Sequence, residues 1–61
     1  MTQKELLYFE DAIMHEINTI AIIDLSIEEL QDNKLIEFMK EQRKKHEKMK
    51  KNLINKLEEK K

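Results

Sequence analysis

The sequence of 61 residues contains no cysteine, no glycine and no proline. Without cysteine there are no disulfide bonds, no thiol chemistry and no zinc sites built on thiolates, which is consistent with a reducing compartment. Glycine and proline are the residues that most often break helices and form turns, so a chain without either is expected to be helical. Aromatic residues make up 5% of the sequence and charged residues 41%. The apolar residues must therefore lie on narrow stripes if they are to form a core.

Long apolar runs are also missing. No segment approaches the roughly 18 consecutive apolar residues that a membrane-spanning helix needs, and the first five residues lack the apolar stretch of a secretory signal. We therefore expect a protein made in the cytoplasm, with no membrane partner. A chain of this size removes only about 60% of its unfolded surface from water on folding. Self-association is expected to supply part of the missing stability.

The net charge is −1, but the charges are unevenly distributed. Residues 1–39 carry two Lys and nine Asp or Glu, whereas residues 40–61 carry ten Lys or Arg and four Glu. A basic segment can bind nucleic acid, but here no aromatic or glycine-rich element accompanies the lysines. We therefore predict that the basic half packs against the acidic half of its own chain or of a partner, and we do not expect nucleic-acid binding.

The first half of the sequence has apolar residues at alternating steps of three and four. They are Leu6, Phe9, Ile13, Ile20, Ile23, Ile27 and Leu30, with Glu16 at one position of the series. This spacing predicts an amphipathic helix over about 3–30. Ser26 and Glu29 also match a capping box. A break at Ser26 would take Ile27 and Leu30 off the apolar face, so we interpret this match as a coincidence.

The turn is predicted at about 31–33, where Asp32 can cap a second helix and Asn33 tolerates a tight connection. The second helix is expected over about 34–59. Its apolar face comprises Leu35, Met39, Gln42, His46, Met49 and Leu53, with Leu57 beside it. Residues 1–61 should therefore form one all-α domain, an antiparallel two-helix hairpin. Folding back at this turn places Glu16 beside His46 and gives each apolar layer a partner.

The first helix has a second apolar set that the hairpin cannot cover. Its members are Leu7, Met14, Ile17, Ala21 and Leu25, with Glu10 and Asp24 among them, and Ile36, Phe38, Ile54 and Leu57 are expected to extend it on the second helix. Contiguous exposed apolar surface usually marks a protein interface. We predict that two copies pack through this surface into a homodimeric four-helix bundle.

Glu16 and His46 fall in the same layer of an otherwise apolar seam. The structural interpretation is a hydrogen-bonded pair that fixes the register of the two helices, supported by Gln42 and Arg43. The functional interpretation is a metal site, because carboxylate bundle proteins bind two metals with a Glu on one helix and Glu-x-x-His on the next. Arg43 replaces the second Glu, which argues against a dimetal site. Glu16 and His46 from two subunits could still hold one metal near a dimer axis.

The sequence offers no catalytic set. A Ser-His-Asp combination, a phosphate-binding loop or paired catalytic carboxylates cannot be assembled from it, and two helices form no deep pocket. We therefore expect neither enzyme activity nor a cofactor.

Several short motifs resemble a known family. Residues Thr2-Gln3-Lys4-Glu5-Leu6, Glu10-Asp11 and His15-Glu16 resemble the first helix of small ferritin-like proteins related to the F-type spore coat proteins of spore-forming bacteria. Gln31-Asp32, followed by Leu35, Phe38 and His46, is similar to the family's Gln-Asp-Pro turn and the helix after it. Asn33 stands where the family has the turn proline. The resemblance implies a helical-bundle protein of the spore or its coat that works through assembly.

Two classes of function follow from the sequence. The first is a structural protein of the spore coat that self-associates and contacts other coat proteins. The second is a regulatory hairpin that docks on a partner protein, as in sporulation phosphatases of similar size. Those proteins carry a Ser-Gln-x-x-Asp signature, whereas the nearest segment here, Ser26-Ile27-Glu28-Glu29, lacks the Gln and the Asp. We therefore rank the structural role first.

Overall fold

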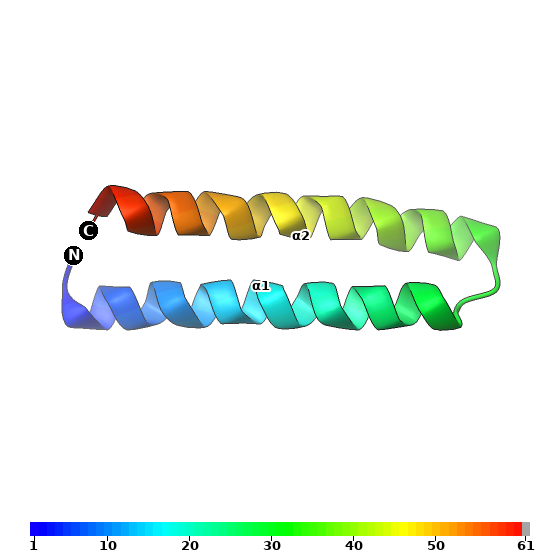
Figure 1. Ribbon diagram of the computed structural model, residues 1–61, viewed down its shortest axis with the longest axis horizontal. Coiled ribbons are helices and arrows are strands. Elements are labelled where there is room, and N and C mark those ends of the chain that lie inside the picture. Colours follow the sequence, from blue (N-terminus) through cyan, green and yellow to red (C-terminus); the bar gives the residue numbers. More distant parts are fainter. Residues whose placement is uncertain (61) are drawn as a thin grey trace.

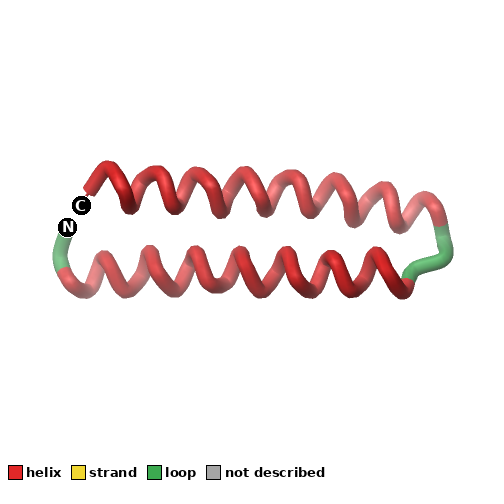
Figure 2. Tube along the Cα trace, in the orientation of Figure 1, coloured by secondary structure: helices red, strands yellow, loops and turns green. Residues whose placement is uncertain are grey.

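The computed structural model describes residues 1–60, which form two helices, α1 (Gln3–Glu29) and α2 (Asn33–Lys60). The helices run antiparallel and lie side by side along their whole length, so that the start of α1 and the end of α2 lie close together (Figure 1). A short loop joins them at the other end (Figure 2). The molecule is a rod of 45 × 15 × 10 Å. The prediction of an all-α antiparallel hairpin is confirmed.

Helix α1 begins with a capping box that the sequence analysis did not identify. The Thr2 hydroxyl accepts a hydrogen bond from the Glu5 backbone N–H at 3.1 Å, and the Glu5 carboxylate accepts one from the Thr2 backbone N–H at 2.7 Å. Two amide groups that lack helical partners are satisfied in this way. The hydrogen bond from the Thr2 backbone N–H, together with the Thr2 side chain, holds the pKa of Glu5 below its usual value.

The connection between the helices uses Asp32 as expected. Its Oδ1 accepts hydrogen bonds from the backbone N–H groups of Lys34 and Leu35, at 2.8 and 3.2 Å, which satisfies the first turn of α2. At the end of α1, the Leu30 N–H still donates to the Ser26 carbonyl while Leu30 itself is extended. Ser26 lies within α1, and its hydroxyl donates to the Ile22 carbonyl. The capping pattern at Ser26 is therefore not used.

The buried residues of the seam, the contact between the two helices, belong to α1. Ile20 and Ile23 are buried, with 6% and 5% of their surface exposed, and Glu16 is buried at 8%. The remaining residues of the predicted apolar series in the first half of the chain are half-buried: Leu6, Phe9, Ile13, Ile27 and Leu30. Within residues 1–60, no α2 residue is fully buried. The hairpin thus has a small core of its own.

On α2, the side that faces α1 differs in part from the predicted one. Leu35 and Met49 are exposed, at 51% and 44%, whereas their neighbours Ile36 and Lys50 are half-buried. The half-buried residues recur at alternating steps of three and four and include Ile36, Met39, Arg43, His46, Lys50, Leu53 and Leu57. Each residue turns a helix by about 100°, so one step along the sequence moves a side chain from the seam to its flank. The seam prediction was correct at Met39, His46 and Leu53 and wrong at Leu35 and Met49.

Neither helix, over the residues that the structure describes, is long and apolar enough to cross a membrane.

Candidate functional site

The middle of the seam holds the predicted polar pair. The Nδ1 atom of His46 lies 2.5 Å from Oε2 of Glu16, across the two helices. The Glu16 side chain is 10% exposed and that of His46 is 23% exposed. A buried carboxylate is costly unless it is hydrogen-bonded, and the imidazole N–H supplies the donor. The pairing of these two residues, predicted from heptad spacing, is confirmed.

Arg43 was expected to support this pair, but it bonds elsewhere. Its Nε and Nη2 atoms donate to the two carboxylate oxygens of Asp24 at 2.6 and 3.3 Å, a bidentate ion pair across the helices. Its Nη1 atom also lies 3.3 Å from Glu47 Oε1, and Glu47 in turn pairs with Lys50 at 3.4 Å. The bond to Arg43 holds the pKa of Asp24 below its usual value, and the same bond raises the pKa of Arg43. These four residues form an ion-pair network beside the seam.

The structure brings together the two residues of the predicted metal site but adds no third ligand. Within residues 1–60 of one chain, no group of three or more His, Asp or Glu side chains is arranged to hold a metal ion. The His46 Nδ1 atom is engaged with Glu16, which leaves Nε2 as the free ring nitrogen. A metal bound by Glu16 and His46 would therefore need ligands from a second chain. This site stays a prediction.

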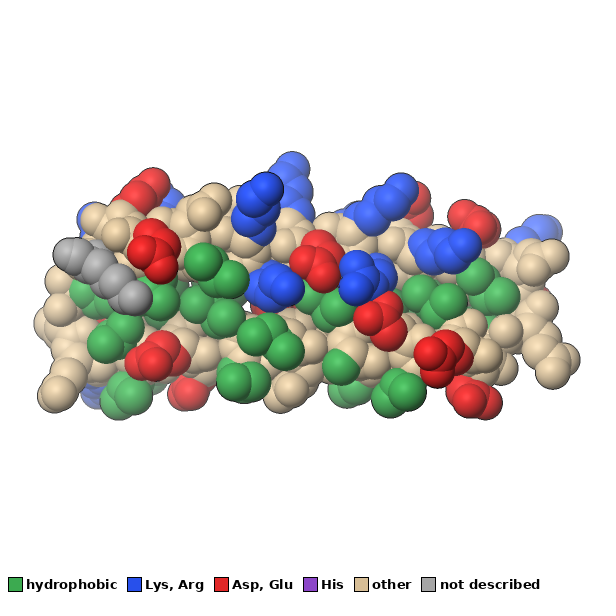
Figure 3. Space-filling model, viewed as in Figure 1, with side chains coloured by type: hydrophobic (Ala, Val, Ile, Leu, Met, Phe, Trp, Pro, Cys, Tyr) green, Lys and Arg blue, Asp and Glu red, His purple; other side chains and the backbone are tan. Residues whose placement is uncertain are grey.

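The predicted interface residues are not covered by the hairpin. Leu7, Met14, Ile17 and Leu25 are 58%, 56%, 42% and 62% exposed, and Ala21 is also exposed. We call these five residues, together with Ile54 of α2, the strip face. On the broad side seen in Figure 3, hydrophobic side chains run along the hairpin among Asp and Glu on α1 and Lys and Arg on α2. Their role as an interface stays a prediction.

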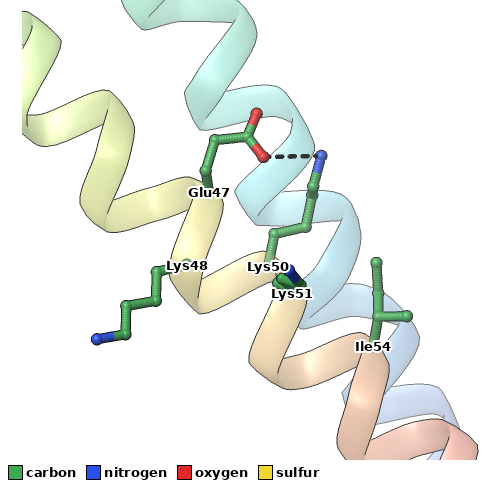
Figure 4. A pocket seen from close by; sticks show the side chains of 5 residues that line it. All are labelled: Glu47, Lys48, Lys50, Lys51 and Ile54. Atoms are coloured by element: carbon green, nitrogen blue, oxygen red, sulfur yellow. Dashed lines mark ion pairs between the residues drawn. The ribbon is translucent and has the colours of Figure 1, made fainter.

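The α2 residues around Ile54 of the strip face are mostly charged. A hollow beside Ile54 is lined by Glu47, Lys48, Lys50 and Lys51. Figure 4 shows Glu47 and Lys50 pointing toward each other while Lys48 extends away. The ion-pair network of Asp24, Arg43, Glu47 and Lys50 borders the same side. The strip face therefore has most of its apolar residues on α1, while its α2 residue Ile54 is surrounded by charged side chains.

The opposite side of the hairpin carries a second apolar surface that the sequence analysis missed. Its large members are exposed: Leu35, Phe38 and Met49 of α2 line hollows on this side, and the turn of about 100° per residue places Tyr8 and Ile22 of α1 on the flank away from Ile17. We call these five residues the aromatic face. The surface on this side is hollowed beside these residues. One hollow is lined by Ser26, Leu30, Leu35, Phe38 and Met39, and another by Phe9, Glu16, Met49, Asn52, Leu53 and Lys56.

The expected extension of the strip face on α2 is wrong in most of its members. Ile36 and Leu57 are half-buried in the seam, and Phe38 lies on the aromatic face with Leu35 and Ser26. The spacing of seven between Ala12, Thr19 and Ser26, which places small residues along one flank of α1, is the sequence signal that could have revealed this surface.

A comparison of the chain with known proteins found no matching family model, curated protein or solved structure. The structure supports the hairpin architecture that the spore-coat resemblance implies. Membership of that family stays a hypothesis.

Proposed function

We propose that this protein is a structural assembly module: a helical hairpin that associates with a second copy to form a four-helix bundle. The observation that carries the proposal is the balance of buried and exposed apolar residues. Among residues 1–60, Ile20 and Ile23 are the hydrophobic residues that are buried, whereas eleven large hydrophobic residues are exposed. A soluble monomer rarely exposes so much of its apolar surface, so these residues are best explained by a partner chain.

The charge of the two helices favours a second copy as that partner. Helix α1 carries seven acidic residues and one basic residue, and α2 carries ten basic and five acidic residues. Each hairpin therefore offers one helix of each sign. A partner with the same pair of helices can match both, which is what a closed two-fold dimer requires.

Concentration dependence tests the proposal. Sedimentation equilibrium over a micromolar range should give a mass of twice 7.4 kDa, and the melting temperature should rise with protein concentration because association stabilises the folded state. A folded species of 7.4 kDa whose melting temperature is unchanged by dilution would contradict self-association. It would then favour the second candidate, a regulatory hairpin that docks on another protein.

The resemblance to F-type spore coat proteins supports a place for this assembly in the spore coat, in contact with other coat proteins. Fractionation of spores that express a tagged chain tests this part separately. Recovery with the coat extract would support it. Recovery in the mother-cell supernatant alone would remove the spore coat from the proposal and leave self-association intact.

A further inference from the structure

We infer that the two copies meet through the aromatic face, with both turns at the same end of the bundle, so that α1 of each copy packs against α2 of the other. This inference rests on the proposed self-association and specifies the surface and the geometry. It differs from the sequence prediction, which placed the dimer on the strip face.

The two faces differ in how much charged surface a dimer would bury. On the aromatic face both helices contribute apolar residues: Tyr8 and Ile22 from α1, and Leu35, Phe38 and Met49 from α2. On the strip face, α2 contributes Ile54 among Lys48, Lys50 and Lys51. Removing several lysine ammonium groups from water costs free energy unless each gains a partner. Lys56 also borders the aromatic face, but there both helices supply large apolar side chains, so the aromatic face is the surface that two copies can bury at lower cost.

The position of a residue along the long axis of the rod, its height, decides which residues of the two copies can meet. Glu5 and Lys56 line one hollow, so they lie at the same height near the ends of the chain. Ser26 and Leu35 line another hollow near the turn and also share a height. A two-fold axis parallel to the helices preserves height. It therefore brings Glu5 of one copy level with Lys56 of the other, and Ser26 level with Leu35.

Steps of seven residues along each helix give two more matches between these two pairs. Ala12 comes level with Met49 of the second copy, and Thr19 with Gln42. Each of the four matches is chemically complementary: a carboxylate with an ammonium group, two small side chains with large apolar ones, and a hydroxyl with an amide. Such small-to-large matching at heptad positions lets neighbouring helices of a bundle approach closely. Ile22 of one copy and Phe38 of the second copy also lie at about the same height, beside these four matches.

The charges of the two helices favour one orientation of the second copy. The alternative two-fold axis, perpendicular to the helices, would pack α1 against α1 and α2 against α2, with the turns at opposite ends. The first contact joins two helices with seven acidic residues each and the second joins two helices with ten basic residues each. Like-charge contacts destabilise helix pairs. The parallel axis instead places the acidic helix beside the basic one in both contacts.

A matched pair of substitutions tests the choice of face. Ile22→Lys changes the aromatic face and Ile17→Lys changes the strip face, with the same residue type replaced on the same helix. Both positions are exposed in the hairpin, 63% and 42%, so both variants should remain helical by circular dichroism. We expect Ile22→Lys to weaken the dimer by about 100-fold or more, because a charge enters an apolar contact, and Ile17→Lys to leave the dimer constant within about threefold. Phe38→Lys should behave as Ile22→Lys does.

The distance between the turns tests the orientation. The chain has no cysteine, so Gln31→Cys allows one spin label per copy at an exposed loop position. Neighbouring helix axes in bundles lie about 8–10 Å apart, and with the label arms the two labels should lie about 20–30 Å apart. Turns at opposite ends would separate the labels by about the 45 Å length of the rod.

Each outcome separates the inference from the proposal on which it rests. A short label distance together with loss of the dimer in Ile22→Lys alone supports the inference. A distance near the length of the rod, or a dimer that survives Ile22→Lys or is lost in Ile17→Lys, overturns the inference while self-association stands. A monomeric wild-type chain with no dipolar coupling between labels overturns both.

Discussion

His46 and Glu16 are thirty positions apart in the sequence, yet the His46 Nδ1 atom lies 2.5 Å from Glu16 Oε2 in the middle of the seam. The two residues join the acidic helix to the basic helix at a depth where an unpaired polar group would be costly. Their pairing permits the apolar layers on both sides of them, at Ile13 and at Ile20, to close around a polar centre.

His46→Ala should destabilise the hairpin. The substitution removes the donor and leaves the Glu16 carboxylate buried, at a cost of about 1–3 kcal/mol. Chemical denaturation at fixed protein concentration measures the change in the free energy of unfolding. The double variant Glu16→Leu with His46→Leu should be neutral or more stable than the wild type, because matched apolar burial often equals a buried polar pair. A double variant less stable than His46→Ala would contradict the interpretation of this pair as a register device.

Acid should remove the contribution of the Asp24 ion pair. The bond to Arg43 lowers the pKa of Asp24 below its ordinary value of 3.8, so the folded state binds fewer protons there than the unfolded state. The contribution is complete above pH 3.8 and is lost as the pH falls through the lower folded value. Asp24→Asn should therefore be less stable than the wild type at pH 7, and the difference should shrink as the pH falls below 3.8.

Salt provides a second measurement of the same pair. Both side chains are partly exposed, so the difference between wild type and Asp24→Asn should shrink as ionic strength rises. Asp11→Asn, which removes an exposed carboxylate from the same helix, serves as the control. If Asp11→Asn and Asp24→Asn showed the same pH profile, net charge rather than the Arg43 bond would explain the effect.

Asp32 should be the residue on which the start of α2 depends most. Asp32→Ala removes the acceptor of two backbone hydrogen bonds and should cost about 1 kcal/mol. For a domain of this size, that corresponds to a fall in melting temperature of about 4–8 °C. Asp32→Asn keeps a capping oxygen and should stay close to the wild type. Equal losses in both variants would show that the negative charge, and not the cap, is what matters.

A metal ion bound by Glu16 and His46 should raise the melting temperature of the wild-type dimer. Glu16 lines a hollow on the aromatic face, so the proposed dimer brings two copies of the pair toward its axis and supplies the ligands that one chain lacks. Titration with zinc, manganese or ferrous iron measures the shift, and His46→Ala should abolish it. An unchanged melting temperature with all three metals would remove the metal site.

The sequence by itself determined the two helices, their antiparallel pairing and the side of α1 that faces α2. The spacing of three and four along α1 holds from Leu6 to Leu30 because an α-helix turns about 100° per residue. The same spacing excluded a break at Ser26 and placed Glu16 opposite His46. The Thr2 and Glu5 capping box was also readable from local spacing, although the sequence analysis did not use it.

The tertiary structure alone decided how α2 is rotated against α1. On this lysine-rich helix, two interleaved series both fit a heptad pattern, one with Leu35 and Met49 and the other with Ile36 and Lys50. Local spacing does not distinguish them, because a lysine stem can cover apolar surface as well as a methionine does. The structure has the second arrangement, in which Arg43 faces α1 and bonds to Asp24. That rotation turns Leu35, Phe38 and Met49 outward and creates the aromatic face, a surface that no pattern within a single helix could specify.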